Sequence, residues 1–358
     1  MQFYLPIFAF LVFYLIFTNF LLKKFNFSLD KEATDENHKS LLRQDNSTPL
    51  SGTFYFLPII LLLFYNLDLQ IIVCCSLLFL LGLFADLKIL TSYKLRLCFQ
   101  FLLISSLFLV SEDIKIDTRI LFINDLMNYD LTRILICTFF FMVLINGFNL
   151  IDGTNCLCSL NFLIISFFLY LLIKNSNTSF IYGELKIFIL ILASSIFLIF
   201  NFFGKNFLGD GAAYGLSFLF GYLLLKISMM NNNISPYFIA NLLWYPAFEN
   251  LFSIMRRNFS KSNNYLPDNN HLHQMIFKFF KKKKIFKKNF ILSSVVGISI
   301  NSILFLNYFI GFNYFNNSKI QIMLSIHNLH YACDERCLAA PSSKLVFAGN
   351  TISNDRTL

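Results

Sequence analysis

Long apolar segments constrain the fold of this chain more than any other feature. A helix that crosses a membrane needs about 20 predominantly apolar residues, and ten stretches approach that length: 2–22, 53–68, 70–85, 97–110, 132–148, 156–173, 187–203, 212–230, 238–254 and 290–312. A weaker eleventh begins near Ile320. Backbone groups in lipid must bond within the protein, so these segments predict helices. We expect an all-α, polytopic transmembrane bundle with about 10–11 spans.

The amino-acid composition also indicates a membrane protein. The chain has 358 residues, of which 56% are hydrophobic and 14% are charged, and it contains 47 Phe, with a mean hydropathy of +0.62. These values lie outside the range of soluble globular domains. The first segment lacks a basic region before it and a small-residue cleavage site, so it predicts a retained helix. We expect one membrane domain over 1–315, followed by a candidate last span and an unassigned polar tail over 316–358.

Basic residues in the loops predict the orientation. With the N-terminus outside, the inside loops are 23–51, 86–96, 149–156, 203–211 and 255–289, which hold 19 of the 29 Lys and Arg residues. Cytoplasmic loops carry such an excess. A lysine run over 281–284 contributes much of the net charge of +9. Such a run is typical of a topology signal that touches anionic lipid, at ~1 kcal/mol per residue. Nothing in the pattern indicates nucleic-acid binding.

Three aspartates, Asp86, Asp152 and Asp210, lie near glycines at the inside ends of apolar segments. A carboxylate at a membrane boundary is costly unless it holds a cation or a polar ligand. Three acids gathered at one membrane face therefore suggest a divalent metal and a phosphorylated ligand. A helix cap or turn is the alternative interpretation for any one of them.

Two inside loops carry further polar residues. The loop 149–155 combines amides, a carboxylate and a glycine. The backbone at the glycine can approach a phosphate or sugar closely, and the amides can bind polar groups of a ligand. The loop 204–211 places three glycines and Asp210 before a predicted helix, whose N-terminus is a ready anion site. Asp210 could there hold Mg²⁺ between phosphates. His271 and His273, in a basic loop, are either surface residues or phosphate donors. The eight cysteines form no metal-binding pattern.

Together these motifs resemble the polyprenyl-phosphate N-acetylhexosamine-1-phosphate transferases of glycosyltransferase family 4. The family's patterns are Thr-Pro-x-x-Gly-Gly, Gly-x-x-Asp-Asp, Asn-x-x-Asn-Leu-x-Asp-Gly, Phe-[Leu/Met]-Gly-Asp and His-[Leu/Ile]-His-His. Matching segments occur in family order at 48–52, 82–86, 146–153, 207–210 and 271–274, so the resemblance covers about residues 1–315.

The resemblance implies that an undecaprenyl phosphate oxygen attacks the β-phosphate of a UDP-N-acetylhexosamine and releases UMP. Mg²⁺, with Mn²⁺ as the alternative, would neutralise the diphosphate. The implied catalytic residues are Asp86, Asp152 and Asp210, with Asp210 and Asp152 as metal ligands. The implied substrate-binding residues are Arg43, Asn149, Gly153, Asn155, Phe207, Arg257, His271 and His273. The implied location is the bacterial cytoplasmic membrane, with the active-site loops facing the cytoplasm and a homodimer left open.

The chain departs from the family patterns at several positions. Ala85 replaces the first acid of the Asp-Asp pair, Asn155 replaces the second Asp of the nucleotide loop, and Cys156 follows in place of Gly. Gln274 replaces the last His of the histidine loop. A mechanism that needs a base at position 85 cannot operate. A phosphate monoester is already largely ionised near neutral pH, so such a base is dispensable.

Three other functions stay open on the sequence. The first is the phospho-MurNAc-pentapeptide transferase of peptidoglycan synthesis, although its longer His-rich loop is missing. This difference favours N-acetylglucosamine or a 6-deoxy derivative as the sugar. The second is a secondary transporter, because intramembrane acids often mark ion pathways. The third is a catalytically silent relative, which Ala85 and Asn155 would explain.

Overall fold

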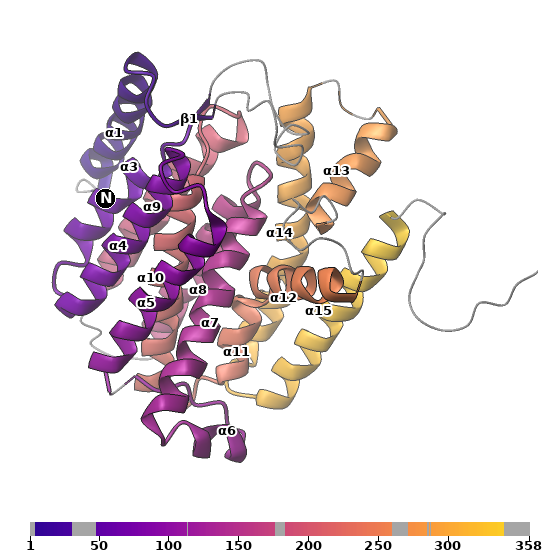
Figure 1. The fold of residues 1–358 in the computed structure, drawn as a ribbon. Coiled ribbons are helices and arrows are strands. Elements are labelled where there is room, and N and C mark those ends of the chain that lie inside the picture. The colour runs from indigo at the N-terminus through magenta and orange to yellow at the C-terminus, as the bar shows by residue number, and fades with distance from the viewer. Residues whose placement is uncertain are drawn as a thin grey trace, which may run out of the picture.

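The computed structural model describes residues 4–30, 48–112, 114–175, 183–259, 271–284, 286 and 288–339. Over these residues the chain forms fourteen helices and two strands of two residues each (Figure 1). The strands, β1 (Leu29–Asp30) and β2 (Thr48–Pro49), pair antiparallel. The predicted all-α bundle is therefore confirmed.

Eight of the helices are long and apolar enough to cross a membrane. They are α1 (Tyr4–Lys24), α4 (Leu69–Asp86), α5 (Tyr93–Val110), α7 (Asp130–Ile151), α8 (Leu157–Asn175), α9 (Glu184–Phe202), α10 (Gly209–Met230) and α14 (Asn289–Asn313). Each coincides with one of the ten segments expected from the sequence. Large apolar side chains such as Phe13 and Phe20 are exposed on α1, as expected for a surface in contact with lipid. The chain is a multi-pass membrane protein.

The other two expected segments form shorter helices. The segment 53–68 gives α3 (Gly52–Leu63), which has 12 residues. The segment 238–254 divides into α11 (Pro236–Leu242) and α12 (Trp244–Phe259). The break precedes Pro246, which lacks a backbone N–H and is accommodated best in the first turn of a helix.

Helix α10 is the centre of the bundle, because it packs against α3, α4, α7 and α8. Its contact with α4 is close: a Cβ on Gly82 would lie 2.5 Å from the backbone of Asp210. Small residues allow such backbone-to-backbone packing between membrane helices. This contact brings the end of α4, at Asp86, to the beginning of α10.

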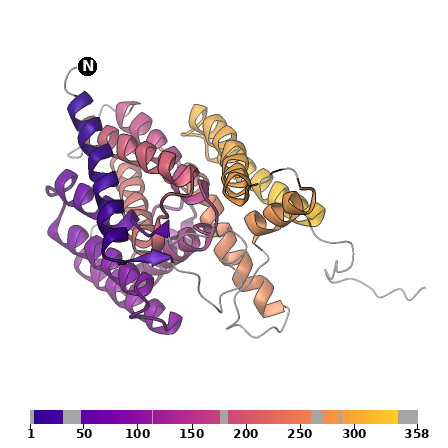
Figure 2. The same cartoon turned by 90° about the horizontal axis from the view of Figure 1, so that it is seen from above.

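The C-terminal helices form a group beside the others (Figure 2). It contains α13 (Leu272–Lys282), α14 and α15 (Ser318–Ala339), and α13 packs against both of the other two. Helix α15 starts close to the weak eleventh segment. Helix α12 packs against α7, and α14 against α8. These contacts bring the histidine segment to the central helices. The short helix α6 (Leu121–Leu126) lies at the far end of the bundle from β1 (Figure 1).

Candidate active site

The three aspartates meet at the first turn of α10. The carboxylate of Asp86 accepts hydrogen bonds from the backbone N–H groups of Asp210 (2.9 Å) and Gly211 (3.2 Å). Asp152, at the C-cap of α7, accepts one from the N–H of Gly209 (3.2 Å). The first N–H groups of a helix have no partner inside the helix and favour negative charge. Two of the acids therefore cap α10 from neighbouring elements.

Only a glycine fits the start of α10. Gly209 has a φ of +82°, a conformation that side chains rarely adopt, and a Cβ there would lie 2.7 Å from Asp86 Oδ2. The sequence analysis interpreted this helix N-terminus as a ready anion site. In the structure, protein carboxylates occupy its first N–H groups.

The third acid, Asp210, pairs with Arg96 on α5. Arg96 Nη1 donates to Asp210 Oδ2 at 2.8 Å, and the two side chains are 24% and 16% exposed. Both side chains are thus accessible from the membrane face. The sequence analysis did not include Arg96 in the predicted site. Its position in a basic inside loop, close to the Asp86 motif, could have indicated that it belongs there.

The early motif at 48–52 is tied to the Phe207 motif by its backbone. Leu50 and Phe207 form a parallel bridge, in which the N–H of Phe207 donates to the carbonyl of Pro49 (3.0 Å) and the N–H of Ser51 to the carbonyl of Phe207 (3.1 Å). This bridge fixes the segment that leads into Gly209. Phe207 itself is half-buried at the same end of α10.

The loop 149–155 lies against α14 and the histidine segment. The N–H of Asn155 donates to Ser293 Oγ at 2.9 Å, and the Asn155 side chain is buried. A Cβ on Gly153 would lie 3.0 Å from His273 Nε2. Asn149 is half-buried in the last turn of α7. The structure therefore brings the predicted nucleotide loop and His273 together.

The two histidines are buried. His271, at the N-cap of α13, places Nδ1 at 3.3 Å from Glu249 Oε2. The rings of His271 and His273 stack with centroids 5.7 Å apart. His273 and Glu249 are fully buried. Of the two alternatives that the sequence left open, the surface position is wrong: both histidines pack between α12, α13 and the loop after α7.

Glu249 is the second residue that the sequence interpretation missed. An acid inside an apolar segment was a signal for it, because such acids are rare without a partner. Arg257 lies in the last turn of α12 and donates to Ser253 Oγ at 3.1 Å. Arg43 lies outside the described residues.

Cys156, where the family pattern has Gly, adopts a φ of +63°. This left-handed conformation favours glycine. Burial raises the pKa of the Cys156 thiol to about 12, so the thiol stays protonated at neutral pH. Its N–H donates to Asn201 Oδ1 at 2.7 Å. Cys156 therefore shapes the loop and is not a nucleophile.

Within the described ranges, no group of three or more His, Cys, Asp or Glu residues is placed to hold a metal ion. Mg²⁺ in phosphoryl-transfer sites is commonly held by one or two carboxylates together with substrate phosphates. Asp152 accepts a hydrogen bond from the N–H of Gly209, and Asp210 follows Gly209 in the chain, so two carboxylates lie near this residue. They do not form a complete protein cage.

Comparison with known proteins agrees with this geometry. The family model of glycosyl transferase family 4 matches residues 69–228, from the start of α4 to near the end of α10. The matched region contains all three aspartates and Arg96. A search of curated proteins found no match. Residues 69–228, a little less than half of the chain, are thus similar to glycosyl transferase family 4, a family of phospho-sugar transferases.

Proposed function

We propose that the protein transfers a sugar 1-phosphate from a UDP-N-acetylhexosamine to undecaprenyl phosphate. A lipid phosphate oxygen would bond to the β-phosphorus of the UDP-sugar. The bond between that phosphorus and the bridging oxygen would break, and UMP would leave with that oxygen. The observation that best supports this reaction is the meeting of Asp86, Asp152 and Asp210 with Arg96 at one helix end.

Each of these residues has a role that follows from its contacts. Asp86 and Asp152 cap α10 and hold its first turn in place. Arg96 orients the Asp210 carboxylate and brings a positive charge to a site that must bind several phosphate groups. Pre-organised charge of this kind provides much of the rate in phosphoryl transfer.

Mg²⁺ would be held by Asp210 and Asp152 and would neutralise the charge of the diphosphate. The nucleophile is already ionised near neutral pH, so the position of Ala85 needs no base. His273, beside Gly153, would orient the nucleotide loop from its buried position.

The site geometry favours this function over transport. The three acids lie at helix ends that meet at the first turn of α10, whereas coupling-ion sites in transporters lie near mid-membrane. We further propose the cytoplasmic membrane of a bacterium as the location, with these helix ends inside, because the basic loops cluster on that side.

A UMP-release assay tests the proposal. Purified protein in lipid nanodiscs receives undecaprenyl phosphate, Mg²⁺ and one UDP-sugar at a time: UDP-GlcNAc, UDP-GalNAc, a 6-deoxy derivative, UDP-MurNAc-pentapeptide or UDP-glucose. We expect UMP with an N-acetylhexosamine, and none when the lipid phosphate or the metal is omitted. UMP only from the pentapeptide substrate would assign the protein to peptidoglycan synthesis. Nucleotide binding without UMP from any sugar would indicate a silent relative.

A further inference from the structure

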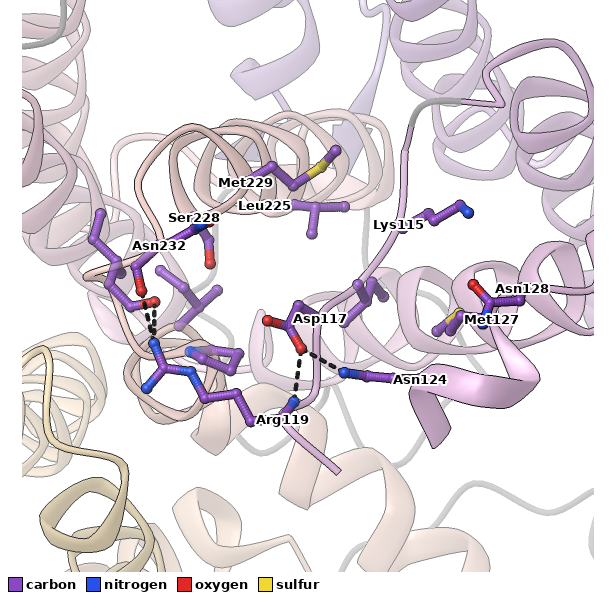
Figure 3. A pocket seen from close by; sticks show the side chains of 14 residues that line it. Lys115, Asp117, Arg119, Asn124, Met127, Asn128, Leu225, Ser228, Met229 and Asn232 are labelled. Atoms are coloured by element: carbon purple, nitrogen blue, oxygen red, sulfur yellow. Dashed lines mark hydrogen bonds between the residues drawn. The ribbon is translucent and has the colours of Figure 1, made fainter. Parts of the chain in front are cut away.

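Figure 3 shows a cavity of about 370 Å³ that is lined by Leu225, Ser228 and Met229 of α10, at the opposite end of this helix from Asp210. Its walls are the last turns of α10, the linker between α5 and α7 with helix α6, and the start of α11. Eighteen helical residues separate Asp210 from Ser228 in this wall, which corresponds to about 27 Å along the helix axis. The cavity therefore lies at the other membrane face and is separate from the candidate active site.

Hydrogen bonds hold the walls of this cavity in place. The guanidinium of Arg119 donates to the carbonyl of Asn232 (2.8 Å) and to Ser318 Oγ (2.9 Å), which joins the linker to α15. Asp117 Oδ1 accepts from the N–H of Arg119 (2.8 Å) and from Asn124 Nδ2 (2.7 Å) (Figure 3). One acid and one base of the lining are thus engaged within the protein.

Lys115 is the remaining cation of the lining. It is exposed, and no ion pair joins it to any residue that the structure describes. The opposite wall offers Ser228 as a hydrogen-bonding side chain beside the apolar Leu225 and Met229 (Figure 3). A cation and a hydroxyl next to apolar surface match an amphiphilic ligand with an anionic head.

The surroundings of the cavity identify the kind of amphiphile. The cavity lies where α5 and α10 end and α7 begins, at a membrane boundary. On the adjoining helix α6, Leu121 and Phe122 are 83% and 72% exposed, as expected for side chains that enter lipid. We propose that this cavity binds the phosphate headgroup of a membrane lipid, with Lys115 as its counter-ion and Leu225 and Met229 against its acyl chains.

The experiment measures ligand-induced thermal stabilisation of the detergent-solubilised protein. The probes are dihexanoyl phosphatidic acid, dihexanoylglycerol and inorganic phosphate. We expect phosphatidic acid to raise the unfolding temperature in a saturable way, and the other two to have little effect. Lys115→Gln should weaken the binding of phosphatidic acid about fivefold, which corresponds to ~1 kcal/mol for a lysine near anionic lipid.

Matched variants make the test specific to this cavity. Lys174→Gln removes the same charge from an exposed residue at the end of α8, outside the cavity, and should bind like the wild type. Lys115→Arg should keep most of the affinity, and Ser228→Trp, which fills the cavity, should abolish binding. Asp210→Asn should not change it, so this result is independent of the proposed transferase activity.

Three results would overturn the proposal. Equal stabilisation by dihexanoylglycerol would remove the role of the phosphate. Equal stabilisation by inorganic phosphate would identify a free-phosphate site in place of a lipid site. Wild-type affinity in both Lys115→Gln and Ser228→Trp would place the lipid elsewhere on the protein.

Discussion

The aspartate half and the histidine half of the site are built in different ways. Asp86 and Asp152 bind backbone N–H groups of α10, and Asp210 stays partly exposed beside Arg96. His271, His273 and Glu249 instead are buried and contact one another. The accessible charge of the site is therefore in the aspartate half, whereas the histidine half is buried against the loop around Gly153.

The largest expected effect is on activity, in the aspartate half. Asp210→Asn should lower the rate of UMP release about 10²–10³-fold, because it removes a charge aimed at the reacting phosphates. Its unfolding temperature should stay close to that of the wild type, since the carboxylate of Asp210 is partly exposed. Asp125→Asn, an exposed acid on α6, is the control and should be fully active. An unchanged rate in Asp210→Asn would disprove the assignment of this residue.

Asp86→Ala should reduce stability as well as activity. It leaves the N–H groups of Asp210 and Gly211 without their acceptor, and each unsatisfied buried group costs ~1–3 kcal/mol. Unfolding of the purified variant by urea, in mild detergent, measures the loss of stability. Asp86→Asn keeps one acceptor oxygen and should lose less stability. If both variants are as stable as the wild type, capping of α10 by Asp86 is not what holds this turn.

A smaller effect is expected in the histidine half. Glu249→Gln should cost ~1 kcal/mol of stability, because the amide still reaches His271 but loses the charge. A double-mutant cycle with His271→Gln measures the coupling energy between the two side chains. Activity should fall less than in Asp210→Asn. A larger loss of activity than in Asp210→Asn would mean that the histidine half carries the chemistry, which would reverse the comparison.

The smallest effect is expected at Cys156. Glycine normally costs ~0.5–1 kcal/mol relative to alanine in a folded chain. At a φ of +63° this order should be reversed, so that Cys156→Gly is at least as stable as Cys156→Ala. Thermal unfolding of the two variants, compared directly, measures the difference. A clearly more stable alanine variant would show that the loop relaxes away from this conformation.

The sequence predicted those parts of the fold that depend on residues within one segment. Apolar length alone located the eight membrane helices, since each must satisfy its backbone within one segment. It did not predict the break between α11 and α12, because Pro246 in an apolar run is compatible with a kinked helix as well as with a new one. The family motifs pointed to the three aspartates. They did not indicate that Asp86 contacts the backbone of α10 whereas Asp210 pairs with Arg96.

The amino-acid sequence was enough to predict the membrane bundle, the clustering of the three acids at one side, and the similarity of residues 69–228 to glycosyl transferase family 4. The groups that these acids contact became visible only in the folded protein. Asp86 meets the backbone of Asp210 across 124 residues of chain, and Arg96 meets Asp210 across 114. Glu249 meets His271 between two helices. Such contacts follow from the packing of α4, α5 and α7 on and around α10, which no local pattern of residues encodes.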